Sequence, residues 1–308
     1  FAPVSASFTA IPSPIPDAAP VTKAVFPDSP SISFLQFVYS IYSADRNKFL
    51  FRNDEVFSSA GIYDHNMIEQ HTKIETEDGR METFTTFPEE GGPFPAIFFF
   101  MDAPGKREEL HDMARRIATT GYYVMLPNLY YRTTEHFELD FETFSNSDEM
   151  FELMSSIGNR MIVRDALRMI ELAESDPNAD SQNIGCIGYC MSGPFSLSVA
   201  AAYPEAIKAT ASIYGVRLVV DSSDSPHLGF NQTNGEIYIA CAEFDDYVPP
   251  EMVTQVSEEL SNSSANGRVE LYEGVHHGFA FPGRGEYDKE AAERHWERVH
   301  ALFDRNLK

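Results

Sequence analysis

The sequence predicts an α/β protein with a mainly parallel sheet and helices packed on both faces of that sheet. From about Met67 onward, apolar segments of strand character alternate with segments whose apolar residues recur at helical spacing. Residues 95–101 contain no polar side chain, as expected of a strand that is covered on both faces. Strands that alternate with helices favour parallel pairing, because each helix carries the chain back to the edge where the previous strand began.

Local signals justify the individual elements. Asp78-Gly79 lies between two strand-like segments and predicts a tight hairpin. Gly121 follows a segment of helical spacing and predicts the end of that helix. The expected elements are, in chain order, strands at 73–77, 81–87 and 95–101, a helix at 107–119, a strand at 122–126, a helix at 148–174, a strand at 183–189, a helix at 194–202, strands at 209–214 and 236–241, a helix at 251–260, a strand at 268–272 and a helix at 287–307.

The α/β domain is expected to span residues 67–308, with residues 1–66 as an N-terminal extension that is rich in proline and partly flexible. Residues 1–30 hold seven of the 19 prolines, which excludes a regular helix or a central strand there. Residues 31–43 are apolar and aromatic but too short to span a bilayer. We expect this segment to pack on the main domain or on a partner; the alternative is an anchor at a membrane surface.

Composition excludes several classes of function. A net charge of -24 argues against binding to nucleic acid or to an anionic membrane surface, and no apolar run is long enough for a membrane span. Three cysteines in 308 residues do not make a disulfide framework, so we expect a reducing compartment and a cytoplasmic location. The chain has neither the ligand spacing of a zinc site nor a glycine-rich phosphate loop, so no metal or other cofactor is expected.

The most informative motif is Gly-Tyr-Cys-Met-Ser-Gly at residues 188–193. It follows an expected strand and precedes an expected helix, which is the setting of a nucleophile elbow in the α/β-hydrolase fold. The usual elbow is Gly-x-Ser-x-Gly; here Cys190 takes the place of the serine, and Ser192 takes the place of the last glycine. The motif therefore predicts the α/β-hydrolase fold with a thiol as the nucleophile.

Polar residues at two further strand ends complete a possible triad. Asp245 and Asp246 follow the strand at 236–241, and His276 and His277 follow the strand at 268–272. In an open α/β sheet the ligand crevice lies at the carboxyl ends of the strands. The chain order of nucleophile, acid and histidine is also that of α/β-hydrolases. Spacing alone does not decide between the two aspartates or between the two histidines, and the unused members could be solvated loop residues.

Each of these groups has an expected chemical role. Cys190 lies at the start of a helix, where the positive end of the helix dipole favours a thiolate. The histidine would accept the thiol proton and later protonate the leaving group, and the aspartate would orient the imidazole. The N–H of Met191 is expected to donate to the developing oxyanion. We expect the second donor in the loop after residues 95–101, where Ala103 has an available N–H and Pro104 has none.

At these residues the chain resembles the dienelactone hydrolase family, a group of α/β-hydrolases that use a cysteine in the elbow. The resemblance runs from about Met67 to Lys308 and rests on Gly-Tyr-Cys-Met-Ser-Gly, Asp-Asp-Tyr-Val-Pro at 245–249 and His-His-Gly-Phe at 276–279. The segments Met-Asp-Ala-Pro-Gly at 101–105 and Leu-Pro-Asn-Leu-Tyr-Tyr-Arg at 126–132 fit as well. The family pattern selects Asp245 as the acid and His277 as the base.

The resemblance also implies a carboxylate beside the thiol, usually Glu, which helps to switch the cysteine between thiol and thiolate. This chain has the shorter Asp102 at that position. Family members that act on dienelactone hold its carboxylate with arginines, one of them shortly after the catalytic histidine. Phe281 occupies the corresponding position here, with Arg284 three residues further on, which suggests a less anionic or a larger substrate.

Tyr131 and Arg132 are expected to line the substrate pocket; the alternative is that they pack on the surface and form an ion pair.

The leading hypothesis is a hydrolase that cleaves a lactone or a small carboxylic ester through a thioacyl intermediate on Cys190. Its expected partner is therefore a small-molecule substrate. The alternative is a non-catalytic α/β-hydrolase relative that binds a small ligand or a partner. A redox-sensing thiol would need a nearby resolving cysteine, and Cys186 is expected to face the core instead.

Overall fold

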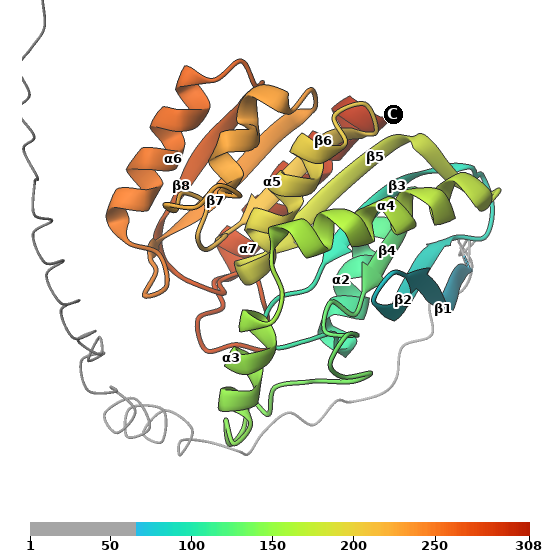
Figure 1. Cartoon of the computed structure of the whole chain (residues 1–308), viewed down its shortest axis with the longest axis horizontal. Helices are drawn as coiled ribbons and strands as arrows, with labels where there is room; N and C mark the ends of the chain where they lie inside the picture. The colour runs from blue at the N-terminus through green and yellow to red at the C-terminus, as the bar shows by residue number, and fades with distance from the viewer. Residues whose placement is uncertain (1–65) are drawn as a thin grey trace, which may run out of the picture. The chain divides into compact units, whose positions relative to one another are not determined.

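The computed structural model describes residues 66–308, which all belong to one compact unit. The expectations for the N-terminal extension, including the proline-rich residues 1–30 and the apolar residues 31–43, lie outside the described residues. Figure 1 shows the described part as a central twisted sheet with helices on both faces. The α/β-hydrolase fold predicted from the elbow motif is the fold that the structure has.

The sheet has eight strands in the order β1-β2-β4-β3-β5-β6-β7-β8. The first two strands pair antiparallel as the predicted hairpin, and β2 also pairs antiparallel with β4. All other pairs are parallel, which confirms the mainly parallel sheet. The strands are β1 (Met67–Thr76), β2 (Gly79–Pro88), β3 (Phe94–Phe100), β4 (Tyr123–Pro127), β5 (Ala179–Tyr189), β6 (Ile207–Ile213), β7 (Glu236–Phe244) and β8 (Gly267–His276).

Helices cover both faces of this sheet, so the central strands are buried on both sides. Figure 1 shows α4, α5 and α6 in front of the sheet, with α2 and α7 behind it. In the central strand β3 every residue except Pro95 is buried, as its wholly apolar sequence predicts. The helices are α2 (Glu108–Ala118), α3 (Ser147–Ser155), α4 (Asn159–Ser175), α5 (Gly193–Ala202), α6 (Pro250–Asn262) and α7 (Lys289–Leu307), with short 3₁₀ turns at Cys190–Ser192 and Pro226–Gln232.

The sequence located each of these strands and α-helices, with one helix divided differently, and it did not locate the 3₁₀ turn at Pro226–Gln232. The helix expected at 148–174 is two helices, α3 and α4, separated by residues 156–158. Gly158 has extended backbone angles and is the N-cap of α4, which explains the break. Gly121 ends α2 as expected, with a φ of 91° and an N–H that donates to the carbonyl of Ala118.

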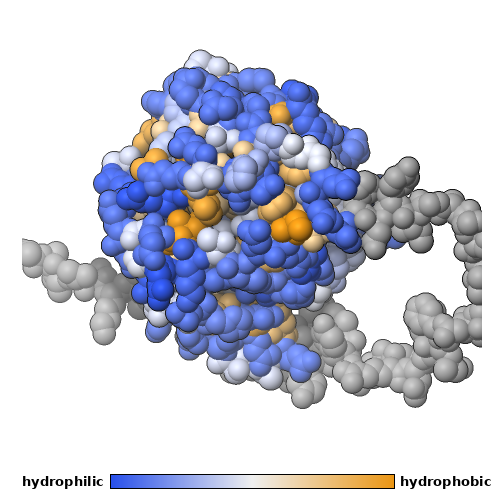
Figure 2. Space-filling model, turned by 90° about the vertical axis from the view of Figure 1, so that its right-hand side faces the viewer, coloured by the Kyte–Doolittle hydropathy of each residue, from blue (hydrophilic) through white to orange (hydrophobic). Residues whose placement is uncertain are grey.

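Several strands are longer than expected, and in β7 and β8 the extension places the polar residues that follow. β7 continues to Phe244 and β8 to His276, so Asp245 and His277 come directly after their strands. The face in Figure 2 is mainly hydrophilic, with small and separate hydrophobic patches. In the described part of the chain, no helix has both the length and the apolar character that a membrane crossing requires.

Candidate active site at the carboxyl ends of the strands

Cys190 stands at the turn between β5 and α5, in a backbone conformation that few residue types adopt. Its φ is 55°, in the left-handed region, which typically costs a non-glycine residue about 1–3 kcal/mol. The two glycines of the elbow make this turn possible. A Cβ on Gly188 would lie 2.0 Å from the carbonyl oxygen of Ser192, and a Cβ on Gly193 would lie 2.5 Å from Cα of Gly215. Close packing of the backbone at these two glycines therefore maintains the strained conformation of Cys190.

Ser192, the departure from the usual elbow glycine, has a structural partner. Its side chain is fully buried, and its hydroxyl donates to the backbone carbonyl of Met101, at the end of β3. The turn keeps its form with serine at this position, because the serine side chain is small. The serine also ties the elbow to the loop that carries Asp102 and Ala103.

His277 and Asp245 form a buried pair. Nδ1 of His277 lies 2.8 Å from Oδ2 of Asp245, and their side chains are 8% and 4% exposed. Asp245 is held in turn by the N–H of Tyr247, which donates to Oδ1 at 2.9 Å. The alternative acid, Asp246, and the alternative base, His276, are both exposed. The structure thus brings together the acid and the histidine that the family pattern selects.

The remaining ring nitrogen of His277, Nε2, is buried and has no hydrogen-bond partner among the described residues. Burial alone would lower the pKa of this histidine. The interaction with Cys190 and the hydrogen bond that Nδ1 donates to Asp245 outweigh burial and raise the pKa of His277 to about 10. His277 therefore carries a proton at neutral pH, which is the form that can donate a proton.

The other two cysteines are chemically different from Cys190. Cys186 and Cys241 are buried, whereas Cys190 is half-buried. Burial raises the pKa of the Cys186 thiol well above its ordinary value, and it raises that of Cys241 to about 12. Both are therefore neutral thiols at physiological pH, as expected of cysteines that act as small apolar residues.

The two expected oxyanion donors, Met191 and Ala103, lie on segments that Tyr130 connects. The Tyr130 hydroxyl donates to the carbonyl of Ala103 at 2.9 Å and lies 3.3 Å from the sulfur of Met191. The N–H of Ala103 donates to no other group within residues 66–308. It is therefore available to an incoming oxygen, as an oxyanion donor must be.

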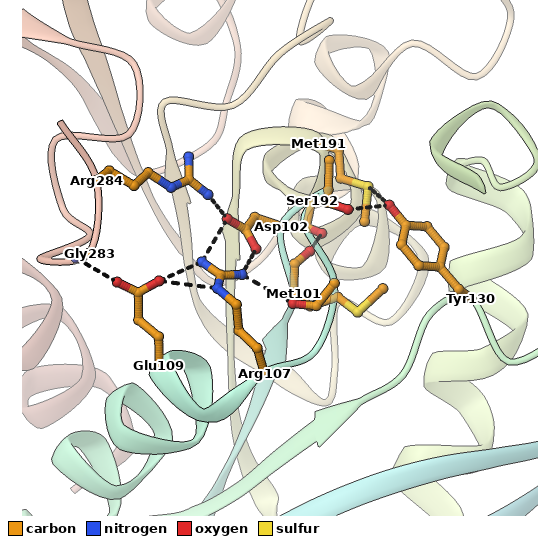
Figure 3. A network of polar contacts seen from close by, with 11 residues as sticks. Met101, Asp102, Arg107, Glu109, Tyr130, Met191, Ser192, Gly283 and Arg284 are labelled. Carbon is orange, nitrogen blue, oxygen red and sulfur yellow. Dashed lines mark hydrogen bonds and ion pairs between the residues drawn. The ribbon is translucent and has the colours of Figure 1, made fainter. Parts of the chain in front are cut away.

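Asp102 is fully buried between two arginines. Its Oδ1 accepts from Nη1 of Arg107 at 2.6 Å, and its Oδ2 accepts from Arg284 (Figure 3). It has no hydrogen bond to Cys190 among the described residues. Arg107 was not anticipated from the sequence, because it lies five residues along the chain in a helix N-terminus where a charged residue is ordinarily solvated. Its side chain is only 3% exposed here.

The three residues that were expected to line the substrate pocket, Phe281, Tyr131 and Arg132, contact other side chains of the protein. Phe281 is fully buried, with its ring 4.5 Å from the guanidinium of Arg284 and 6.2 Å from the ring of Tyr214, so it presents no open surface to a substrate. The Tyr131 hydroxyl lies 2.9 Å from Asp165, and Arg132 forms an ion pair with the same carboxylate at 2.8 Å. This is the ion pair that the alternative reading of Tyr131 and Arg132 describes.

Two further aromatic residues flank His277. Tyr214 is buried, with its ring centroid 4.9 Å from that of His277 and its hydroxyl without a partner in the described part. Tyr247 is 62% exposed, and its ring packs edge-on against the imidazole at 4.8 Å. Sequence reasoning missed both, although Tyr247 stands in the Asp-Asp-Tyr-Val-Pro motif and could have been found there. Across residues 66–308 no three His, Cys, Asp or Glu side chains are grouped as metal ligands.

Comparison with known proteins shows the family of this chain. The family model described as "Dienelactone hydrolase family" matches residues 81–307, which is most of the chain. The chain belongs to the dienelactone hydrolase family. It is accordingly a hydrolase of the class that acts on carboxylic ester bonds.

Relatives of this dienelactone hydrolase family member cover most of its length. A Synechocystis protein named "Putative carboxymethylenebutenolidase" is 27% identical over 70% of this chain and 88% of its own. A protein of the same name from Methylorubrum extorquens is 27% identical over 77% of this chain and 81% of its own. The crystal structure titled "Putative Dienelactone Hydrolase" from Klebsiella pneumoniae superposes with a TM-score of 0.69 at 24% identity, covering 78% of this chain and 99% of that one.

Proposed function

We propose that this protein hydrolyses a lactone or a small carboxylic ester through a thioacyl intermediate on Cys190. The main support for the proposal is the buried His277–Asp245 pair. Nε2 of His277 has no hydrogen-bond partner among the described residues, and interaction with Cys190 raises the pKa of this histidine. A thiolate, a proton carrier and an orienting carboxylate are the groups that nucleophilic acyl transfer needs.

The proposed reaction has two halves. The Cys190 thiolate attacks the carbonyl carbon, and the resulting oxyanion is stabilised by the N–H groups of Met191 and Ala103. The C–O bond breaks, and the His277 imidazolium gives its proton to the leaving alkoxide, which in a lactone stays attached to the acyl chain. Water then attacks the thioester and gives a proton to His277, and the Cys190 thiolate leaves to release the carboxylic acid.

We propose a neutral substrate in preference to an anionic one. An arginine can hold a substrate carboxylate only if its charge is not already neutralised. Arg284 is paired with Asp102, and Arg107 is shared between Asp102 and Glu109. The cavity beside them is also lined by Glu138, and the whole chain has a net charge of -24. The aromatic rings of Tyr247 and Tyr214 beside His277 suit an apolar acyl or leaving group.

The test is a matched pair of cysteine variants assayed on a panel of lactones and aryl esters. Cys190→Ala is expected to lower kcat/KM by at least about 10³-fold, as loss of a nucleophile does in related triads. Cys241→Ala, which removes a buried neutral thiol, should keep the activity. Mass spectrometry of the acid-quenched wild-type protein should show the acyl mass on Cys190. Hydrolysis that survives in Cys190→Ala would refute the proposal.

A further inference from the structure

Two chain segments carry the groups that must act together in the proposed reaction. Residues 101–107 follow β3 and carry Asp102 and the oxyanion donor Ala103. Residues 277–288 follow β8 and begin with His277. They belong to different strands and are far apart in sequence. A specific set of contacts must therefore fix the position of one segment relative to the other.

The histidine segment makes few hydrogen bonds to other segments, although Phe279 and Phe281 are buried in the core. Most of its backbone hydrogen bonds are internal, such as those from Phe281 to Gly278 and from Arg284 to Phe281. In the described part of the chain, residues 278–288 form three hydrogen bonds to residues before them: the N–H of Phe279 donates to the carbonyl of the adjoining His276, and the other two reach the segment that follows β3. The N–H of Gly283 donates to Oε1 of Glu109 at 3.0 Å, and the guanidinium of Arg284 donates to Asp102.

Both of these attachments end on a carboxylate that Arg107 holds. Arg107 donates from Nη1 to Oδ1 of Asp102 at 2.6 Å, and from Nη2 to Oε2 of Glu109 at 2.7 Å. Its Nη1 also donates to the carbonyl of Gly105, 3.1 Å away, within the oxyanion segment. Figure 3 shows the Arg107 guanidinium between the two carboxylates, with Gly283 and Arg284 on their far sides.

Burial makes this arrangement rigid. The side chains of Asp102, Arg107 and Arg284 are 0%, 3% and 12% exposed. Hydrogen bonds between buried charged groups are short and directional, and a buried charge that loses its partner is strongly disfavoured. Asp102 and Arg107 therefore cannot move without breaking contacts that solvent does not replace, whereas Glu109 is 23% exposed.

We propose that Arg107 is a positioning residue that, through Asp102 and Glu109, fixes the segment bearing His277 against the segment bearing Ala103. The distance between the proton carrier and the oxyanion donor is then set before substrate binds. This inference rests on the proposed hydrolysis for its effect on rate, but the contacts themselves are independent of it. A shift of about 1 Å in such a geometry can cost about 100-fold in rate.

The test uses Glu109, because an Arg107→Ala variant would leave the fully buried Asp102 with one arginine in place of two and is expected to destabilise the fold. Glu109→Ala removes the bond to Gly283 and one of the two carboxylates on Arg107. Asp112→Ala is the matched control: it removes another carboxylate from α2 that is paired with an arginine, Arg115, but that is exposed. Glu109→Gln keeps an acceptor for Gly283 and should restore part of the activity.

We expect Glu109→Ala to lower kcat by about 10- to 100-fold, with KM changed by less than about threefold, because the change affects the transition state more than substrate binding. Asp112→Ala should match the wild type in both. Hydrogen exchange needs no substrate: residues 278–288 should exchange faster in Glu109→Ala than in Asp112→Ala, while the thermal unfolding of both variants stays cooperative.

Equal kcat values in Glu109→Ala and Asp112→Ala would overturn the positioning role. The Cys190→Ala result separates this outcome from a failure of the proposed function. If hydrolysis requires Cys190 but does not change in Glu109→Ala, the proposed hydrolase function is supported and the positioning role is rejected. If hydrolysis does not need Cys190, exchange in residues 278–288 still decides whether Glu109 fixes this segment, and unchanged exchange would reject it.

Discussion

Replacing Asp245 by Asn should move the alkaline limit of activity to lower pH. The proposed acylation needs a protonated His277 to give its proton to the leaving group. The wild-type pKa of His277 is about 10, because Cys190 and Asp245 together outweigh the effect of burial. In Asp245→Asn the charged hydrogen bond to Nδ1 is lost, so His277 should release its proton at a lower pH.

The size of the shift follows from the geometry of the pair. The two side chains are less than one tenth exposed and lie 2.8 Å apart, so solvent screens their interaction little. A hydrogen bond to a charged group contributes about 1.5–3 kcal/mol. At about 1.36 kcal/mol per pH unit, its loss lowers the pKa of His277 by roughly 1–2 units.

The assay is the pH profile of kcat/KM on a neutral alkyl ester, because its alkoxide leaving group needs a proton; this profile reports the ionisations of the free enzyme. The wild type should lose activity near pH 10, and Asp245→Asn should lose it roughly 1–2 units lower. Asp246→Asn is the control, because its carboxylate is the exposed neighbour of Asp245. An alkaline limit that is the same in Asp245→Asn and in the wild type would refute the role of this pair.

The same ionisation makes stability depend on pH. His277 binds its proton more tightly in the folded chain, with a pKa of about 10, than at its ordinary value of 6.5. Its contribution to the free energy of unfolding is therefore fully present below pH 6.5 and is lost as the pH rises through 10. Asp245→Asn should reduce this alkaline loss, measured as Tm against pH, while Asp246→Asn should leave it unchanged.

Two other changes test the surroundings of the site. Gly105→Ala should destabilise the protein by more than about 2 kcal/mol, since a φ of 95° is strained for alanine and its Cβ would lie 2.1 Å from the carbonyl oxygen of Phe137. Gly274→Ala has a similar φ of 77° with no atom within 4 Å, so chemical denaturation should show a smaller loss there, and equal losses would contradict the argument. Tyr247→Ala should raise KM for an aryl ester by about 3- to 10-fold with kcat nearly unchanged, because it removes an exposed ring beside His277. Steady-state kinetics of Phe244→Ala, an exposed ring that packs on His276, provide the comparison, and an equal effect there would count against a binding role for Tyr247.

The fold was predictable because its signals are local. The Asp78-Gly79 turn, the apolar run of β3 and the alternation of strands with helices each depend on a few neighbouring residues. The same holds for the positions of Cys190, Asp245 and His277 at strand ends, since parallel strands bring their carboxyl ends to one edge. The break between α3 and α4 was missed because the apolar spacing continues across Gly158, and only backbone conformation distinguishes an interruption from a continuous helix.

The surroundings of Asp102 could not be predicted, because they depend on contacts between residues that are distant along the chain. Arg284 lies 182 residues after Asp102, and Gly283 lies 174 residues after Glu109. A sequence shows that Asp102 is one methylene shorter than the usual glutamate, but not what compensates for the difference. In the structure both oxygens of Asp102 accept hydrogen bonds, from Arg107 and from Arg284. Movement of this carboxylate toward Cys190 would break these buried contacts and is therefore unfavourable. We therefore expect the thiolate of Cys190 to depend on His277 in the free protein, and the neighbouring carboxylate to act on geometry more than on the charge of the thiol.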